Sequence, residues 1–164
     1  MNAGTGDGEM KDIVESVTVE GRGGALVEVP DAAAGFGYRR SRFQRTREVI
    51  VGALLRLPDR PWDEELATRE PEYRKRTQPL PQPNCGSIFA NPPGDFAARL
   101  IEECGLKGRT IGGAQISPLH ANFIVNLGSA AARDVAALMD AARGAVRDRF
   151  GIELRSEIRM VGFQ

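Results

Sequence analysis

The sequence predicts a protein of the α+β class. Valine-rich segments with alternating side chains come first, whereas apolar residues at helical spacing dominate the later part of the chain. Strands and helices that occupy separate stretches of sequence are typical of this class. The 164 residues, 41% hydrophobic and 27% charged, suffice for one core or two small sub-domains.

The N-terminal part is expected to be mainly β-structure. Residues 13–19 and 25–29 largely alternate between apolar and polar and are separated by a Gly-rich segment, which predicts a β-hairpin. A further strand fits residues 49–57. Residues 36–43 contain too many arginines for a core element. Residues 58–84 hold six prolines, so we expect a linker with no regular element longer than a short helix near residues 62–69.

The C-terminal part carries the two predicted helices. Apolar residues at helical spacing predict the first over residues 96–104, with Asp95 as a cap and Gly105 as a stop. A strand is expected over residues 122–127. Ser129 can cap a longer helix that Gly151 ends. The alternation over residues 152–161 predicts a last strand.

Charge and composition exclude several kinds of partner. Lys plus Arg equals Asp plus Glu, 22 against 22, so no net field favours binding to nucleic acid or to an anionic membrane. The longest apolar run is far shorter than the ~20 residues of a membrane-spanning helix. With two cysteines and one histidine, the chain has too few ligands for a zinc site. We therefore expect a cytoplasmic protein with no metal.

Four local features can carry chemistry, and each has a simpler interpretation. The segment Tyr38-Arg39-Arg40-Ser41 suits a carboxylate or a phosphate, but a solvated basic loop has the same composition. Ser87 follows a glycine in a turn, yet the second glycine of a hydrolase elbow is absent. His120 can bind a ligand or lie hydrogen-bonded at the surface. Glu157 lies between Arg155 and Arg159, which is typical of an exposed salt-bridged face.

Taken together and in order, several motifs are similar to those of the UDP-N-acetylenolpyruvoylglucosamine reductase (MurB) family of flavoenzymes. They are Met-Asn-Ala-Gly at 1–4, Phe-Gly-Tyr-Arg-Arg-Ser at 36–41, Gln-Pro-Leu at 78–80, Cys-Gly-Ser-Ile-Phe-Ala-Asn-Pro at 85–92, Gly-Leu-Lys-Gly at 105–108, Ile-Gly-Gly-Ala at 111–114, His-Ala-Asn-Phe-Ile-Val-Asn at 120–126 and Glu-Leu-Arg-Ser-Glu-Ile-Arg-Met-Val-Gly at 153–162. The resemblance covers nearly the whole chain, and the matching motifs belong to the second half of the family's sequences.

The resemblance implies a domain organisation. Residues 1–60 would be the remnant of an FAD-binding domain, residues 61–84 a Pro-rich linker, and residues 85–164 a small α+β substrate-binding domain. The earlier flavin-binding segments of the family have no counterpart here. A missing N-terminal FAD-binding segment is therefore an expected partner, and we do not expect this chain to hold FAD tightly alone.

The resemblance also implies a reaction and the residues that perform it. The family uses FAD, reduced by NADPH, to reduce the enolpyruvyl ether of a UDP-amino sugar in peptidoglycan synthesis. Ser87 would supply the proton at C2, while Arg39 and Glu157 would stabilise the aci-carboxylate intermediate. Substrate contacts carry over to Tyr38, Asn91, His120 and Arg76, and cofactor contacts to Asn2, Gly4 and Gly6.

One departure and one alternative remain open. The family often has lysine immediately before the Gln-Pro stretch, where this chain has Thr77, and Arg76 or Lys75 can replace it. The alternative to an enzyme is a non-catalytic fragment or paralogue that at most binds a nucleotide sugar.

Overall fold

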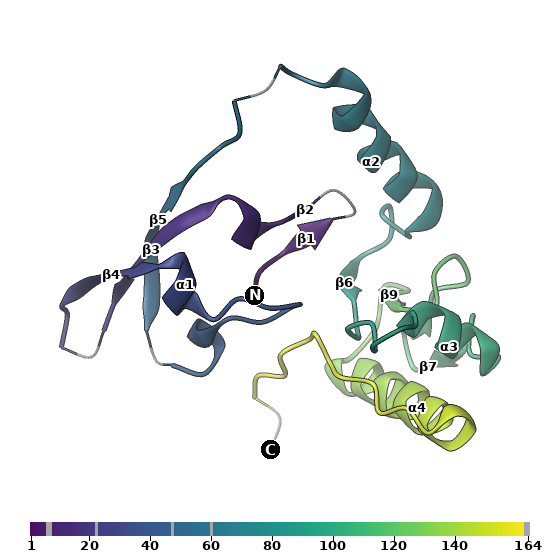
Figure 1. Ribbon diagram of the computed structural model, residues 1–164. Helices are drawn as coiled ribbons and strands as arrows, with labels where there is room; N and C mark the ends of the chain where they lie inside the picture. Colours follow the sequence, from purple (N-terminus) through teal and green to yellow (C-terminus); the bar gives the residue numbers. More distant parts are fainter. Residues whose placement is uncertain (6–7, 22, 47, 60, 163–164) are drawn as a thin grey trace. The chain divides into compact units, whose positions relative to one another are not determined.

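The computed structural model describes residues 1–164 except 6–7, 22, 47, 60 and 163–164 (Figure 1). The chain divides into two compact units, residues 1–62 and residues 63–164. Among the described residues, no helix combines the length and the apolar character needed to span a membrane.

The first unit is built on a three-stranded antiparallel sheet. Its strand order is β4-β3-β5, with β3 spanning Val14–Glu20, β4 spanning Leu26–Pro30 and β5 spanning Val49–Leu55. The predicted hairpin and the predicted third strand are thus confirmed. Alternate valines of β3 and β4 form a small core with two half-buried phenylalanines, and this core contains Val14, Val17, Val19, Val29, Phe36 and Phe43.

Short elements surround this sheet. Strands β1 (Gly4–Thr5) and β2 (Gly8–Glu9) pair with each other ahead of the 3-10 helix η1 (Met10–Asp12). Helix α1 (Asp31–Ala34) and the 3-10 helix η2 (Arg42–Gln44) lie between β4 and β5 in the sequence. The arginine-rich segment, residues 36–43, follows α1 and forms no strand or α-helix, but Phe36 and Phe43 at its two ends pack against the small core.

The predicted Pro-rich linker contains a longer helix than expected. Helix α2 spans Glu64–Thr77 and includes Pro71. Asp63 caps it by accepting the N–H of Leu66 at 2.9 Å, and basic residues fill its last turn. Because α2 buries no residue, water can bond the carbonyl that Pro71 leaves without a partner. The prolines from Pro79 onward follow the helix, where the chain is irregular.

A four-stranded antiparallel sheet and two helices form the rest of the second unit (Figure 1). The order is β6-β9-β8-β7, and the strands span Asn84–Ser87 (β6), Thr110–Ile111 (β7), Ala114–Ile116 (β8) and Phe123–Asn126 (β9). Strand β9 confirms the predicted strand at 122–127, whereas β6, β7 and β8 are not predicted from the sequence. Helices α3 (Ala97–Glu103) and α4 (Ala132–Phe150) pack into one core with the sheet.

The N-terminal ends of α3 and α4 differ from the sequence prediction. Phe96, predicted on the apolar face of α3, is the N-cap and is 65% exposed. Asp95 binds the N–H of Phe96 at 2.7 Å and the side chain of Arg99 instead of capping the helix. Ser129 precedes α4 without capping it, and the carboxylate of Asp134 accepts the N–H of Ala131 at 2.9 Å. Gly151, with φ of 67°, ends α4 as predicted.

The last predicted strand is wrong. Residues 152–161 form no regular strand, and their single bridge joins Phe89 to Ser156. The Ser156 hydroxyl donates to the carbonyl of Ile158 at 2.9 Å and lies 3.1 Å from its N–H, which turns the backbone away from the sheet. Leu154 is buried, but Met160, predicted on the same face, is 48% exposed.

Candidate functional site

The N-terminal loop is held by the side chain of Asn2. This residue is 3% exposed and adopts a left-handed backbone with φ of 52°. Its Nδ2 donates to Glu9 Oε2 at 2.9 Å and to the carbonyl of Gly37 at 3.1 Å, while its Oδ1 accepts the N–H of Lys11 at 2.8 Å. These bonds give Asn2 a positioning role in the loop that carries Gly4. Gly6 lies outside the described residues.

Arg39 projects from a tight turn toward this loop. The backbone groups of Gly37 and Arg40 bond each other at 3.0 Å in both directions, which places Tyr38 and Arg39 at the tip. Arg39 has a left-handed backbone with φ of 53°. Its guanidinium donates to the carbonyl of Gly4 at 3.2 Å and lies 5.2 Å from the ring centroid of Tyr38. The structure therefore brings together Tyr38, Arg39 and Gly4, three of the residues singled out in the sequence.

A cleft of about 870 Å³ opens beside Gly4. Two segments contribute to its lining, Ala3, Gly4, Thr5, Gly8, Glu9, Met10, Asp12 and Ile13 in the first and residues 56–59 in the second. A side chain at position 4 would not fit, because its Cβ would lie 2.8 Å from Glu9 Cγ and 3.1 Å from the Gly8 carbonyl. Asn2 does not line the cleft. The volume of the cleft lies within the range of ligand and cofactor sites in proteins.

Ser87 and Glu157 lie on two backbone segments of the second unit that bond each other next to these residues. Ser87 is the last residue of β6, and the N–H of Glu157 donates to the carbonyl of the next residue, Ile88, at 3.0 Å. The N–H of Ala90 donates to the carbonyl of Arg155 at 2.9 Å on the other side of the bridge. Both Ser87 and Glu157 are half-buried. Arg39 belongs to the first unit, so convergence of all three side chains stays a prediction.

Asn122 fixes the segment that follows Ser87, and the sequence reasoning missed its importance. Its Oδ1 accepts the N–H of Phe89 at 3.0 Å, and its Nδ2 donates to the carbonyl of Phe89 at 2.8 Å. The backbone carbonyl of Asn122 also accepts the N–H of Ile88 at 3.0 Å. The Asn122 side chain thus makes the two hydrogen bonds to Phe89 that the backbone of a neighbouring strand would otherwise make. The signal available in sequence was an amide side chain at the start of a predicted buried strand.

His120 is connected to the same network. Its Nδ1 accepts the N–H of Asn122 at 3.2 Å, so the proton of the neutral ring is on Nε2. The ring meets Phe123 edge to face at 4.7 Å between centroids. Burial lowers the pKa of His120, so the ring is neutral at pH 7 and carries its one N–H donor at Nε2.

The other predicted substrate contacts are exposed. Asn91 Oδ1 accepts the N–H of Ala97 at 3.0 Å, so this side chain also supports the start of α3. Arg76 lies in the last turn of α2. Thr77, at the position of the family lysine, donates its hydroxyl to the carbonyl of Tyr73 at 2.8 Å. That Arg76 or Lys75 replaces the family lysine stays a prediction.

The described residues contain no group of three or more His, Cys, Asp or Glu side chains placed to hold a metal ion. The candidate polar groups are instead an arginine beside a glycine loop in the first unit, and, in the second unit, a serine at the end of β6, a glutamate in the segment after α4 and a neutral histidine before β9. Such groups suit a carboxylate-bearing or phosphate-bearing organic substrate.

The second unit has the fold of a known domain. Residues 78–161 match the family model described as UDP-N-acetylenolpyruvoylglucosamine reductase, C-terminal domain. A crystal structure of UDP-N-acetylenolpyruvylglucosamine reductase (MurB) from Thermus caldophilus superposes with a TM-score of 0.78 and 41% identity, covering 96% of this chain and 57% of that one.

Curated relatives extend the match to the first unit. A UDP-N-acetylenolpyruvoylglucosamine reductase of Anaeromyxobacter sp. (strain Fw109-5) is 50% identical over 163 residues, covering 99% of this chain and 51% of the relative. A reductase of the same name from Chlamydia felis is 41% identical, covering 100% of this chain and 55% of the relative. The chain belongs to the UDP-N-acetylenolpyruvoylglucosamine reductase family, and it spans about half the length of these relatives.

Proposed function

We propose that this protein serves the reduction of UDP-N-acetylglucosamine enolpyruvate to UDP-N-acetylmuramate in peptidoglycan synthesis, with FAD as cofactor and NADPH as reductant. The observation that carries the proposal is the bond from the Arg39 guanidinium to the Gly4 carbonyl at 3.2 Å. This bond supports the proposal because, by resemblance to the family, Arg39 would bind the substrate carboxylate and the loop of Gly4 would hold the flavin. A nucleotide-linked substrate also favours a cytoplasmic location.

The residues present fit the flavin. Gly4 lines a cleft of about 870 Å³, which is large enough for part of a dinucleotide, and the position needs glycine because a Cβ would overlap Glu9 Cγ. Gly4 would contact the cofactor directly, and Asn2 would hold the loop that presents it. When bound and reduced by NADPH, FAD supplies the hydride that reaches C3 of the enol ether.

The chain's own residues would handle the charge and the proton. Arg39 would offer paired N–H donors to the carboxylate as negative charge develops there. Glu157 is half-buried and would assist Arg39 in stabilising the aci-carboxylate intermediate. The hydroxyl of Ser87 would give its proton to C2, which requires close positioning because a serine hydroxyl is a weak acid. The bonds of Asn122 to Phe89, which hold the segment after β6, would contribute to that positioning.

The substrate contacts would be distributed over both units. Tyr38 would act beside Arg39, and Asn91 beside the Ser87 turn. Neutral His120 would donate Nε2–H to the diphosphate, and Arg76 would add a positive charge in place of the family lysine.

Replacement of Ser87 by alanine tests the proposal. The assay needs flavin-loaded protein, prepared by adding FAD to the purified chain or, if FAD is not retained, by substituting residues 1–164 for the matching half of the Anaeromyxobacter relative. Ser87→Ala should slow reoxidation of the flavin by the enolpyruvyl substrate about a hundredfold or more, while NADPH reduces the flavin at the normal rate.

The matched control is Cys85→Ser, which alters a neighbouring exposed side chain and should leave both half-reactions unchanged. Equal loss of both half-reactions in Ser87→Ala would indicate a folding defect, and unchanged reoxidation would remove Ser87 from the mechanism. If the unmodified protein binds the UDP-sugar but never reoxidises the flavin, the alternative of a non-catalytic nucleotide-sugar binder is correct.

A further inference from the structure

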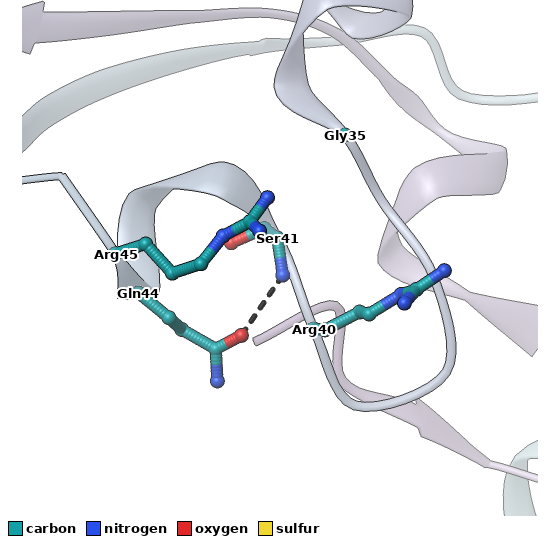
Figure 2. A pocket seen from close by; sticks show the side chains of 5 residues that line it. All are labelled: Gly35, Arg40, Ser41, Gln44 and Arg45. Atoms are coloured by element: carbon teal, nitrogen blue, oxygen red, sulfur yellow. Dashed lines mark hydrogen bonds between the residues drawn. The ribbon is translucent and has the colours of Figure 1, made fainter.

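A second cavity of the first unit has no role in the proposed reaction. It has a volume of about 300 Å³ and lies along the turn and 3-10 helix that follow Tyr38 (Figure 2). Five residues line it: Gly35, Arg40, Ser41, Gln44 and Arg45. None of them lines the larger cleft beside Gly4.

The hydroxyl of Ser41 is buried at this cavity without a partner. Ser41 is 5% exposed, and its Oγ has no hydrogen bond among the described residues. Its backbone N–H is already satisfied by Gln44 Oε1 at 2.9 Å, the dashed line in Figure 2. An unpaired buried hydroxyl costs free energy that a ligand oxygen would recover.

Two arginines at the same cavity have no countercharge. Within the described ranges, neither Arg40 nor Arg45 has a side-chain hydrogen bond or ion pair, and both are exposed. Arg42, between them in the sequence, differs because it is paired with Glu48, with Nε 3.3 Å from Oε2. A side chain at Gly37 would place Cβ 2.5 Å from Arg40 Nε, so glycine leaves room for the guanidinium.

We propose that this cavity binds the phosphate group of a small anionic ligand. Arg40 and Arg45 would supply charge-assisted N–H donors to the phosphate oxygens, and the Ser41 hydroxyl, which has almost no exposed area in this structure, would donate to one of them once its neighbours shift. The volume exceeds that of one phosphate ion, so the site accommodates either free phosphate with water or a phosphomonoester. The phosphate chemistry is common to both sources.

Nuclear magnetic resonance of the ¹⁵N-labelled full chain tests this site. Inorganic phosphate added at constant ionic strength should shift the Ser41 and Gln44 amides and the Arg40 and Arg45 Nε–H signals saturably, whereas sodium chloride should not. Arg45→Ala and Ser41→Ala should each raise the phosphate Kd at least about threefold, since each removes a donor to the anion.

Arg109→Ala is the matched control, because Arg109 is also an exposed arginine without a side-chain partner in the described residues, and it should leave the Kd unchanged. Arg45→Lys, which keeps the charge, should weaken binding less than Arg45→Ala and guards against a folding defect. Glycerol 3-phosphate in a parallel titration distinguishes the sources: a lower Kd than phosphate identifies a phosphomonoester, and an equal or higher one identifies free phosphate. Shifts that do not saturate, or that Arg109→Ala weakens as much as Arg45→Ala, would overturn the proposal.

Discussion

Replacing Asn122 by alanine should destabilise the second unit strongly. The change removes two hydrogen bonds to Phe89, at 3.0 and 2.8 Å, from a position that is 3% exposed. Phe89 is itself 1% exposed, so its backbone N–H and carbonyl would remain buried without partners. At about 1.5 kcal/mol for each unsatisfied group, the free energy of unfolding should fall by about 3 kcal/mol.

Urea unfolding followed by circular dichroism at the helical band measures this loss. The long helices α2 and α4 belong to the second unit, so the signal reports mainly on that unit. The unfolding midpoint should decrease while the slope with urea stays unchanged, because the surface exposed on unfolding is the same. Reoxidation of the flavin by substrate should also slow, since Ser87 lies two residues before Phe89.

Asn84→Ala is the matched control. Its amide also makes several bonds, including one to the carbonyl of Gln82 at 2.8 Å and one from the N–H of Gly86 at 2.9 Å. Asn84 is exposed, so water can replace these partners and the loss should stay below about 1 kcal/mol. Equal losses in the two variants, or a loss below 1 kcal/mol for Asn122→Ala, would refute the argument from burial.

Two further predictions concern glycines and a surface carboxylate. Gly144→Ala in α4 should raise the free energy of unfolding by about 1 kcal/mol, because the added Cβ meets nothing within 4 Å. Gly113→Ala should lower the free energy of unfolding by about 2 kcal/mol, because the added Cβ would overlap the backbone of Ser129 and Ala130. A Gly113→Ala variant that is more stable in urea than Gly144→Ala would contradict this. Mainly through the Arg99 side chain, and also through the N–H of Phe96, the pKa of Asp95 is lowered from 3.8 to about 2. This interaction therefore stabilises the fold above pH 3.8 and is lost as the pH falls through about 2. A carboxyl-carbon titration should give a higher pKa for Asp95 in Arg99→Ala, and an unchanged value would exclude the ion pair as its cause.

Local patterns in the sequence determined the elements that stabilise themselves or pair with a sequence neighbour. Alternating valines on either side of a Gly-rich segment predicted β3 and β4, because a hairpin needs only a turn and two complementary strands. A long apolar stripe ending at Gly151 predicted the body and the end of α4. The ordered motifs also indicated the family, including the turn that displays Arg39.

Only the tertiary structure decided the elements that depend on distant partners. Residues 152–161 alternate like a strand, yet the bonds of Ser156 limit their pairing with Phe89 to one bridge. Residues 64–77 form a helix in spite of Pro71, because solvent can satisfy the backbone that a core would leave unpaired. The two bonds of Asn122 and the unpaired hydroxyl of Ser41 follow from which backbone or cavity each side chain meets. Such contacts join residues that are remote in sequence, or they depend on burial. A periodic sequence pattern cannot predict them, because it shows only which face of its own helix or strand a residue occupies.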